Sequence, residues 1–323
     1  TIPSPNATAG GAFGAAVAGN SLMLVVGAPQ ELVEIEATEP TNQTVPIRAG
    51  RAYLYQPGDA IPQLSFVSLN PEADGNFGFS VAVADLNLAV GAPGETVETA
   101  AQAGRAYYFD CATDVVLQVF EAPQAAVGDE FGFAVAARGF EVFVGAPGAN
   151  DGQGIVYRFD GLSGALLDTY TSPDAQDGGR FGAALAVDGN RLVVGAPNEI
   201  DVNQDQFARG RVHLFEIGSG DFEQTLQSED DPDGGLFGSS VAIASGTVWV
   251  GAPGESAGEG RSYEFDAVSG TQRDTYSSPN GEDDGGFGAV VAATGANVLI
   301  GAPAEDGGAV DSGRAYLNPD PDS

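Results

Sequence analysis

The sequence predicts an all-β protein built of six four-stranded antiparallel sheets, on three observations. A Phe-Gly pair, followed about a dozen residues later by Gly-Ala-Pro, recurs six times in 323 residues. Successive pairs are 50 to 64 residues apart, a period typical of solenoids and propellers. Apolar residues alternate with small or polar ones between frequent turn residues, as in strands and hairpins. The pairs are Phe13-Gly14, Phe77-Gly78, Phe131-Gly132, Phe181-Gly182, Phe237-Gly238 and Phe287-Gly288.

The fourth repeat illustrates the elements expected in each sheet. Its first strand is predicted at residues 181–187 and its second at 192–195, which Pro197 ends because proline has no N–H to donate. A loop follows, and then the third strand at 210–215 and the fourth at 222–226. Four antiparallel strands in about 50 residues are typical of one blade of a β-propeller.

The two ends of the chain predict how the blades close. The 37 residues from Phe287 onward and the 12 ahead of Phe13 together make about one more period, which favours a closed ring over an open solenoid with atypical caps. The last repeat ends after a third strand at 313–317, whereas Ser4-Pro5-Asn6 lies ahead of Phe13 as Ser278-Pro279-Asn280 lies ahead of Phe287. We therefore expect one domain, residues 1–323, that forms a six-bladed β-propeller closed by an N-terminal strand.

The repeated residues have structural roles in this interpretation. Glycine permits close backbone approach, so the Phe-Gly pairs let the inner strands crowd together while each Phe wedges between blades. Arginine recurs at the start of the third strand, where its planar guanidinium is expected to pair with a carboxylate of the same or the next blade. Ile155 stands at this place in the third repeat. The arginines are Arg51, Arg105, Arg211, Arg261 and Arg314.

The repeated phrase resembles the FG-GAP repeats of the integrin α-subunit propeller and, more closely, the shorter FG-GAP repeats of secreted bacterial and archaeal proteins. The resemblance covers nearly the whole chain and implies a propeller; it says little about activity, because propellers have many unrelated functions. The integrin propeller has seven blades and holds calcium between the first two strands of several of them. Here the corresponding turns, such as residues 18–21 and 188–190, are too short for that cage, so those calcium sites do not carry over.

Composition excludes several classes of function. The chain has 45 acidic residues against 12 basic ones, all of them arginine, and a net charge of −33, which opposes binding to nucleic acid or anionic lipid. The sequence contains no apolar run of the roughly 18 residues that a membrane span needs. The acidic, lysine-free composition is similar to that of halophilic proteins, and Cys111, the single cysteine, is expected to be packed and inert. The start at Thr1 is consistent with a mature secreted chain.

Most of the acidic residues fall in two sets of loops that a propeller places on one face. The best candidate for calcium binding within them is the segment 201–205, which spaces Asp201, Asn203 and Asp205 at alternate positions as a calcium loop does. A solvated loop is the alternative, because Gln206 stands where such a loop needs glycine. Asn6 and Asn42 begin glycosylation sequons, in Asn6-Ala7-Thr8 and Asn42-Gln43-Thr44.

Three functions remain open from the sequence. The first is a secreted or cell-surface, non-enzymatic module that binds a protein or glycan through its acidic loop face, with bridging Ca²⁺. The second is a structural subunit of an extracellular assembly, in which Thr1 to Pro5 closes a blade of a neighbouring copy. The third is a hydrolase, which has little support because His213 is the only histidine and occupies a strand position that the other blades fill with tyrosine.

Overall fold

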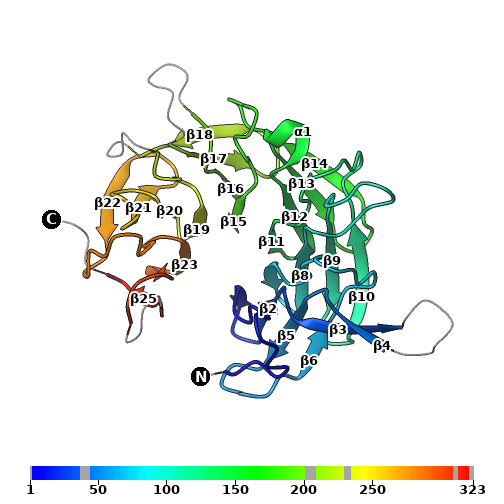
Figure 1. Cartoon of the computed structure of the whole chain (residues 1–323). Coiled ribbons are helices and arrows are strands. Elements are labelled where there is room, and N and C mark those ends of the chain that lie inside the picture. Colours follow the sequence, from blue (N-terminus) through cyan, green and yellow to red (C-terminus); the bar gives the residue numbers. More distant parts are fainter. Residues whose placement is uncertain (1, 37–43, 201–208, 229–233, 308–311, 320–323) are drawn as a thin grey trace. The chain divides into compact units, whose positions relative to one another are not determined.

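The computed structural model describes residues 2–36, 44–200, 209–228, 234–307 and 312–319, and the described residues form 25 strands and one helical turn (Figure 1). The chain divides into two compact units. The first comprises Thr1–Ala149 and Val156–Thr169, and the second comprises Asn150–Ile155 and Tyr170–Ser323. No helix among the described residues has the length and hydropathy of a membrane-spanning segment.

The first unit contains blades one and two and most of blade three, each an antiparallel sheet of four strands. Blade one consists of β1 (Ala16–Gly19), β2 (Leu24–Ala28), β5 (Arg51–Tyr55) and β6 (Leu64–Phe66). Blade two consists of β7 (Ser80–Ala84), β8 (Asn87–Ala92), β9 (Arg105–Asp110) and β10 (Val115–Phe120). Blade three consists of β11 (Ala134–Arg138), β12 (Glu141–Ala146), β13 (Ile155–Asp160) and β14 (Leu166–Tyr170).

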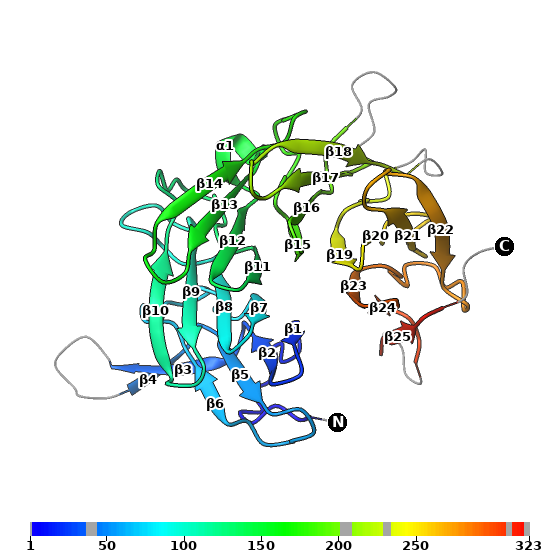
Figure 2. The same cartoon turned by 180° about the vertical axis from the view of Figure 1, so that it is seen from behind.

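The second unit contains blades four, five and six, and Figure 2 shows the strands of blade four side by side from behind. Blade four consists of β15 (Ala184–Asp188), β16 (Arg191–Ala196), β17 (Arg211–Glu216) and β18 (Phe222–Leu226). Blade five consists of β19 (Ser240–Ala244), β20 (Thr247–Ala252), β21 (Arg261–Asp266) and β22 (Gln272–Ser277). Blade six consists of β23 (Val290–Thr294), β24 (Asn297–Ala302) and β25 (Arg314–Leu317). The turn α1 (Ala149–Gly152) joins β12 to β13.

The predicted all-β fold of six propeller blades is confirmed, with two differences. The long loop after β2 contains a further hairpin of β3 (Leu32–Glu36) and β4 (Thr44–Arg48), where the sequence indicated only a loop. Among the described residues, blade six has three strands, and the closing N-terminal strand is not shown, because residues 2–5 form no strand. Pro3 and Pro5 have no N–H to donate, so only an outermost strand could accommodate them.

The N-terminal segment packs on blade one instead. Ile2 contacts the apolar cluster that contains Val26 and Tyr53, and the Ser4 hydroxyl donates to Glu31 Oε1 at 2.5 Å. Ser278, which follows the last strand of blade five, contacts Tyr316 of blade six in a similar way. Ser4 therefore occupies, next to blade one, the place of a serine that follows a fourth strand.

The recurring Phe-Gly and Gly-Ala-Pro motifs have the packing role between blades that the sequence predicted. Five of its six phenylalanines are completely buried, and Phe13 is half-buried. Phe237 illustrates the contact, because its ring lies 5.6 Å from that of Tyr263 and 5.9 Å from that of Phe265. A Cβ on Gly27 would lie 2.0 Å from the carbonyl oxygen of Gly78. Glycine is thus required where the second strand of one blade meets the Phe-Gly turn of the next.

Candidate functional site

A buried glutamate follows the Gly-Ala-Pro triplet in five of the six blades, two residues after the proline. The side chains are at most 2% exposed, although glutamate is almost never fully buried unless it is paired. The proline itself ends the second strand, so each glutamate lies at the start of the loop that leads to the third strand. The five residues are Glu31, Glu95, Glu199, Glu255 and Glu305.

Blade two shows how such a carboxylate is held. The Tyr107 hydroxyl, from the third strand, donates to Glu95 Oε2 at 2.6 Å and lies 2.9 Å from the hydroxyl of Ser68, which follows the last strand of blade one. Arg105 Nη1 lies 3.4 Å from the same Glu95 oxygen. Burial raises the pKa of Glu95 above its ordinary value, against the lowering effect of these donors. Three elements of two blades therefore meet at one carboxylate.

We call this arrangement the carboxylate latch: a buried acid, a ring from the third strand of the same blade and a serine that precedes the blade. Four further latches follow the pattern. Tyr53, Tyr263 and Tyr316 donate to Glu31, Glu255 and Glu305, and His213 Nε2 lies 2.8 Å from Glu199 Oε2. Their serines are Ser4, Ser172, Ser228 and Ser278.

At four latches, a glycine two residues before the Phe-Gly pair makes room for the glutamate. A Cβ on Gly75 would lie 3.0 Å from Cγ of Glu95, and one on Gly179 would lie 2.9 Å from Cγ of Glu199. Gly11 and Gly285 stand in the same relation to Glu31 and Glu305, at 2.7 and 2.8 Å. The space that the glutamate side chain fills is therefore the space that a side chain at the glycine would take.

Blade three supplies its buried acid from another position, where Asp129 Oδ2 accepts from the N–H of Ala126 at 2.7 Å. Ala149 replaces the glutamate, and Asp129 replaces the glycine. Asp129 is 5% exposed, and burial raises its pKa above the ordinary value. Its carbonyl oxygen accepts from the N–H of Gly148 at 3.1 Å, just as Gly75 accepts from Gly94, which establishes the equivalence of the two positions. Burial, with the charge of Asp129, raises the pKa of Tyr157 to about 12. Either position can thus supply the buried carboxylate.

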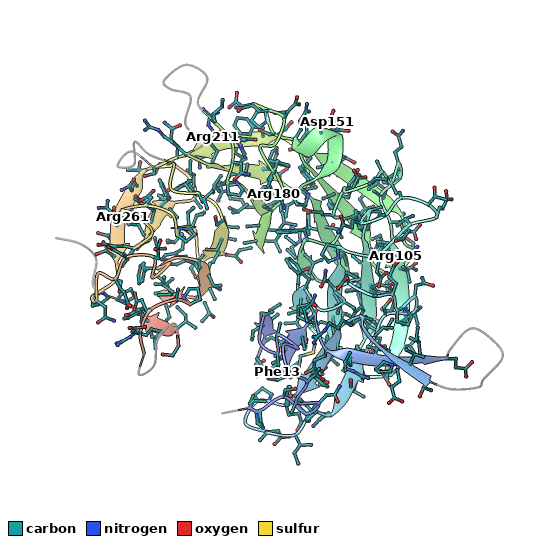
Figure 3. The ribbon with its side chains drawn as sticks, in the orientation of Figure 1. Phe13, Arg105, Asp151, Arg180, Arg211 and Arg261 are labelled. Atoms are coloured by element: carbon teal, nitrogen blue, oxygen red, sulfur yellow. The ribbon has the colours of Figure 1, made fainter. Side chains whose placement is uncertain are left out.

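The predicted arginine–carboxylate pairs are present at Arg105, Arg211 and Arg314. Arg105 bonds Glu121 Oε1 at 2.7 Å in addition to Glu95, Arg211 pairs with Asp174, and Arg314 Nε lies 3.9 Å from Glu305 Oε2. Arg51 differs, because its Nε donates to the carbonyl of Leu32 at 3.1 Å. Figure 3 labels Arg105, Arg211 and Arg261, each at the start of a third strand.

The isoleucine exception in the third repeat now has a reason. Ile155 stands at the arginine position of the one blade in which alanine replaces the latch glutamate. Ala122 also stands there at the place of the latch serine, since it follows the fourth strand of blade two. The arginine and the serine are therefore both missing from the blade in which the acid comes from another position.

His213 occupies a latch position, as the sequence indicated. It is fully buried, its Nε2 faces Glu199, and its Nδ1 lies 3.0 Å from Thr225 Oγ1 on the neighbouring strand. Its ring also lies 5.8 Å from that of Phe181. The imidazole thus makes the contacts that a tyrosine ring makes in the other latches, and these contacts are structural.

In blades two and three, backbone hydrogen bonds join the loop between the second and third strands to the loop that leaves the blade. In blade two, Gly104 N–H donates to the carbonyl of Glu95 at 2.8 Å, which closes the loop between the second and third strands. Gly128, in the loop that leaves the same blade, donates to Ala101 of that closed loop at 3.0 Å. Gly178 and Asp151 make the equivalent bond at 3.1 Å. The two loops thus lie side by side wherever these bonds form.

The structure places few of the other candidate residues. Asp201, Asn203, Asp205 and Asn42 lie outside the described residues. Asn6 is exposed, as a sequon acceptor must be. Cys111 is half-buried, and burial raises the pKa of its thiol to about 12. In the described part of the chain, no three Asp, Glu, His or Cys side chains gather closely enough to hold a metal ion.

Sequence reasoning missed the latch glutamates, although a signal was present. The fixed spacing of Gly-Ala-Pro, one residue and Glu recurs five times, and the exception at Ala149 coincides with Asp129 and Ile155. In a chain with 45 acidic residues, these five do not stand out by composition.

A comparison with known protein families matches residues 169–215 to the family described as FG-GAP repeat. The matched segment contains the Phe181-Gly182 pair, the triplet at Gly195 and the latch residues Glu199 and His213. No curated protein matches the chain.

Proposed function

We propose that this chain, an FG-GAP repeat β-propeller, is a non-enzymatic binding module of the extracellular space or the cell surface. It engages a protein or a glycan through the loops at the latched edge of its blades. The observation that carries the proposal is the set of carboxylate latches, because each latch uses a buried carboxylate to hold those loops in place. A rigid scaffold that presents loops is a common arrangement of binding proteins.

The exposed residues of these loops indicate the chemistry of the contact. In blade six, Asp283 and Asp284 lie in the entering loop and Asp306 in the loop after the second strand, and all three are exposed. The two loops touch, since the N–H of Asp306 donates to Glu282 Oε2 at 2.9 Å. A partner that meets them offers hydrogen-bond donors, positive charge or a bridging divalent cation such as Ca²⁺.

The proposal is tested by binding to a glycan array and to immobilised basic and acidic proteins, in calcium and in chelator. The loop variant carries Asp283→Asn, Asp284→Asn and Asp306→Asn. The control variant makes the same change at exposed residues outside these loops, Asp114→Asn, Asp221→Asn and Asp274→Asn. We expect at least tenfold weaker binding in the loop variant alone. Equal binding by the two variants would contradict a role for the loops.

A second candidate function, a subunit that assembles by strand exchange, is favoured by the open edge of blade six. β25 has no outer neighbour among the described residues, and Leu317 is 68% exposed, whereas the equivalent strand β9 is almost wholly buried. Such an edge is a template for a strand of another chain. In this proposal the strand is Thr1 to Pro5 of a second copy.

Light scattering distinguishes the two functions. Strand exchange predicts that the full chain forms assemblies whose size grows with concentration and that a chain without residues 1–5 stays monomeric. A full chain that stays monomeric at all concentrations would exclude strand exchange and leave the binding module.

A further inference from the structure

Three latches carry an asparagine two residues after the latch serine, at Asn6, Asn70 and Asn280. The N–H of each asparagine donates to the hydroxyl of its serine, at 3.2, 2.9 and 3.1 Å, so the three residues occupy one structural position. All three are exposed. They differ in the residue that follows, which is alanine, proline and glycine in turn. Asn280-Gly281 is the only Asn-Gly pair in the chain.

An asparagine followed by glycine is chemically labile in an exposed turn. The peptide nitrogen of the glycine bonds to Cγ of the asparagine and closes a succinimide ring, while the Cγ–Nδ2 bond breaks and ammonia leaves with the proton of the peptide N–H. Water then opens the ring at either carbonyl, which gives aspartate or isoaspartate. A side chain on the second residue hinders the approach of its nitrogen, and glycine has none.

The surroundings of Gly281 leave room for this approach. Both residues of the pair are exposed, so water reaches them. Gly281 has a φ of +52°, and no atom beyond its chain neighbours lies within 4 Å of the place where a Cβ would stand. Its N–H donates to the carbonyl of Ser278 at 3.2 Å, at the long end of the range for such bonds. The attacking nitrogen therefore lies in an open turn and is held by a long hydrogen bond.

The side chain of Asn280 is part of the latch of blade six. Its Nδ2 donates to the Tyr316 hydroxyl at 2.7 Å and to Glu305 Oε2 at 3.2 Å. Glu305 is 0% exposed, and its Oε1 has no hydrogen-bond partner among the described residues. Replacing the amide by a carboxylate removes both donated bonds and places a negative charge beside a buried acid, which is unfavourable.

Blade four shows what a carboxylate at this position needs. Asp174 stands there, its N–H donates to the Ser172 hydroxyl at 3.1 Å, and its carboxylate pairs with Arg211. The corresponding Arg314 of blade six instead donates from Nε and Nη2 to the carbonyl of Asp306, at 3.1 and 2.6 Å. A carboxylate at position 280 would therefore lack the arginine that Asp174 has.

We propose that Asn280-Gly281 is a site of spontaneous deamidation and that the carboxylate it forms weakens the latch of blade six. The reaction takes up water and releases ammonia, and no enzyme or partner takes part. The inference therefore goes beyond the proposed binding function and does not depend on it. Its effect is a slow, irreversible gain of negative charge in the loop that carries Asp283 and Asp284.

The equivalent asparagines provide controls within one molecule. The full chain, produced without glycosylation, is incubated at neutral and mildly alkaline pH, and peptide mapping by mass spectrometry measures aspartate and isoaspartate at each position. We expect at least tenfold more conversion at Asn280 than at Asn6, and none by this route at Asn70, because Pro71 has no N–H. Conversion should accelerate with pH, since the attacking nitrogen must lose its proton. An Asn280 that stays intact, or that converts no faster than Asn6, would overturn the proposal.

Two variants separate the chemistry from its consequence. Gly281→Ala should convert at least tenfold more slowly, and conversion at the wild-type rate would overturn the assigned route. Asn280→Asp introduces the product charge at once and should lower the melting temperature. Asn70→Asp makes the same change in blade two, where the described residues show no bond from the asparagine amide to the latch, and should lower it less. An Asn280→Asp variant as stable as wild type would overturn the effect on the latch.

Discussion

Exchanging the latch of blade three for the latch of its neighbours tests whether the two acidic positions are alternatives. Ala149→Glu alone should destabilise the protein, because at four other latches a Cβ at the glycine position would lie only 2.7–3.0 Å from the glutamate Cγ. Asp129 has that Cβ and a carboxylate in addition. Overpacking of this kind costs about 1–3 kcal/mol, and the proximity of two acids adds to it.

Asp129→Gly alone should also destabilise the protein. It removes the buried acid near Tyr157 and leaves the N–H of Ala126 without its carboxylate acceptor, which costs about 1–3 kcal/mol. The double variant Asp129→Gly/Ala149→Glu restores the arrangement of the other blades. We expect the two substitutions to compensate each other by at least about 1 kcal/mol, within the usual range of coupling between contacting residues.

The assay is thermal unfolding of the wild type, the two single variants and the double variant, followed by circular dichroism. For a unit of this size, 1 kcal/mol corresponds to about 2–4 °C in melting temperature. Ala149→Gln in place of Ala149→Glu separates the volume of the side chain from its charge, and adding Ile155→Arg should raise the double variant further. Additive effects of the two single substitutions would refute the idea that the positions share one space.

Four further outcomes follow from the same structure. His213→Tyr should fold with little change, whereas His213→Phe should lose about 1–3 kcal/mol in unfolding measurements because Glu199 then lacks a buried donor. Burial raises the pKa of Glu95, and the stability that such a carboxyl contributes is complete below its ordinary pKa and is lost as pH rises through the folded-state pKa. The free-energy difference between wild type and Glu95→Gln should therefore favour wild type more at a pH of about 4 than at about 7, and a constant difference would contradict this sign. Deleting residues 1–5 removes Ile2 and Ser4 from blade one and should lower the melting temperature, and an unchanged value would mean that these contacts contribute nothing. Salt or calcium should raise the melting temperature by screening or bridging the carboxylates, and indifference to salt, calcium and chelator would contradict this.

Much of the fold could be predicted from the sequence because its signals are local and repeated. The strands of blade four begin and end close to the predicted residues, since proline and glycine fix their ends whatever the neighbouring blades do. The hairpin of β3 and β4 was missed because Pro46 interrupts the alternating pattern there. The closing strand was inferred because Ser4-Pro5-Asn6 lies ahead of Phe13 as Ser278-Pro279-Asn280 lies ahead of Phe287. Ser4 does lie where a serine after a fourth strand would lie, but residues 2–5 form no strand.

The candidate site was less predictable because its residues are defined by contacts between separate segments. Glu95, Tyr107 and Ser68 are far apart in the sequence and come together only when one blade packs on the next. The conformation of the loops brings them together, which no periodicity of the sequence encodes. In blade three, the third-strand tyrosine Tyr157 has Asp129 as its acidic neighbour, from a different position than in the other blades. The sequence pattern could not predict this contact either.

Blade three shows that the fold requires a buried acid at this place but does not require a glutamate at one fixed position. If the glutamates were retained for an exposed chemical role, a blade without one would need no substitute at the same spot. Blade three instead supplies a buried acid, Asp129, from another position near its third-strand tyrosine, and it does so where the arginine and serine partners are absent. The constant element is therefore a buried carboxylate between blades. This favours a structural role for the latches and leaves recognition to the exposed loops that they hold.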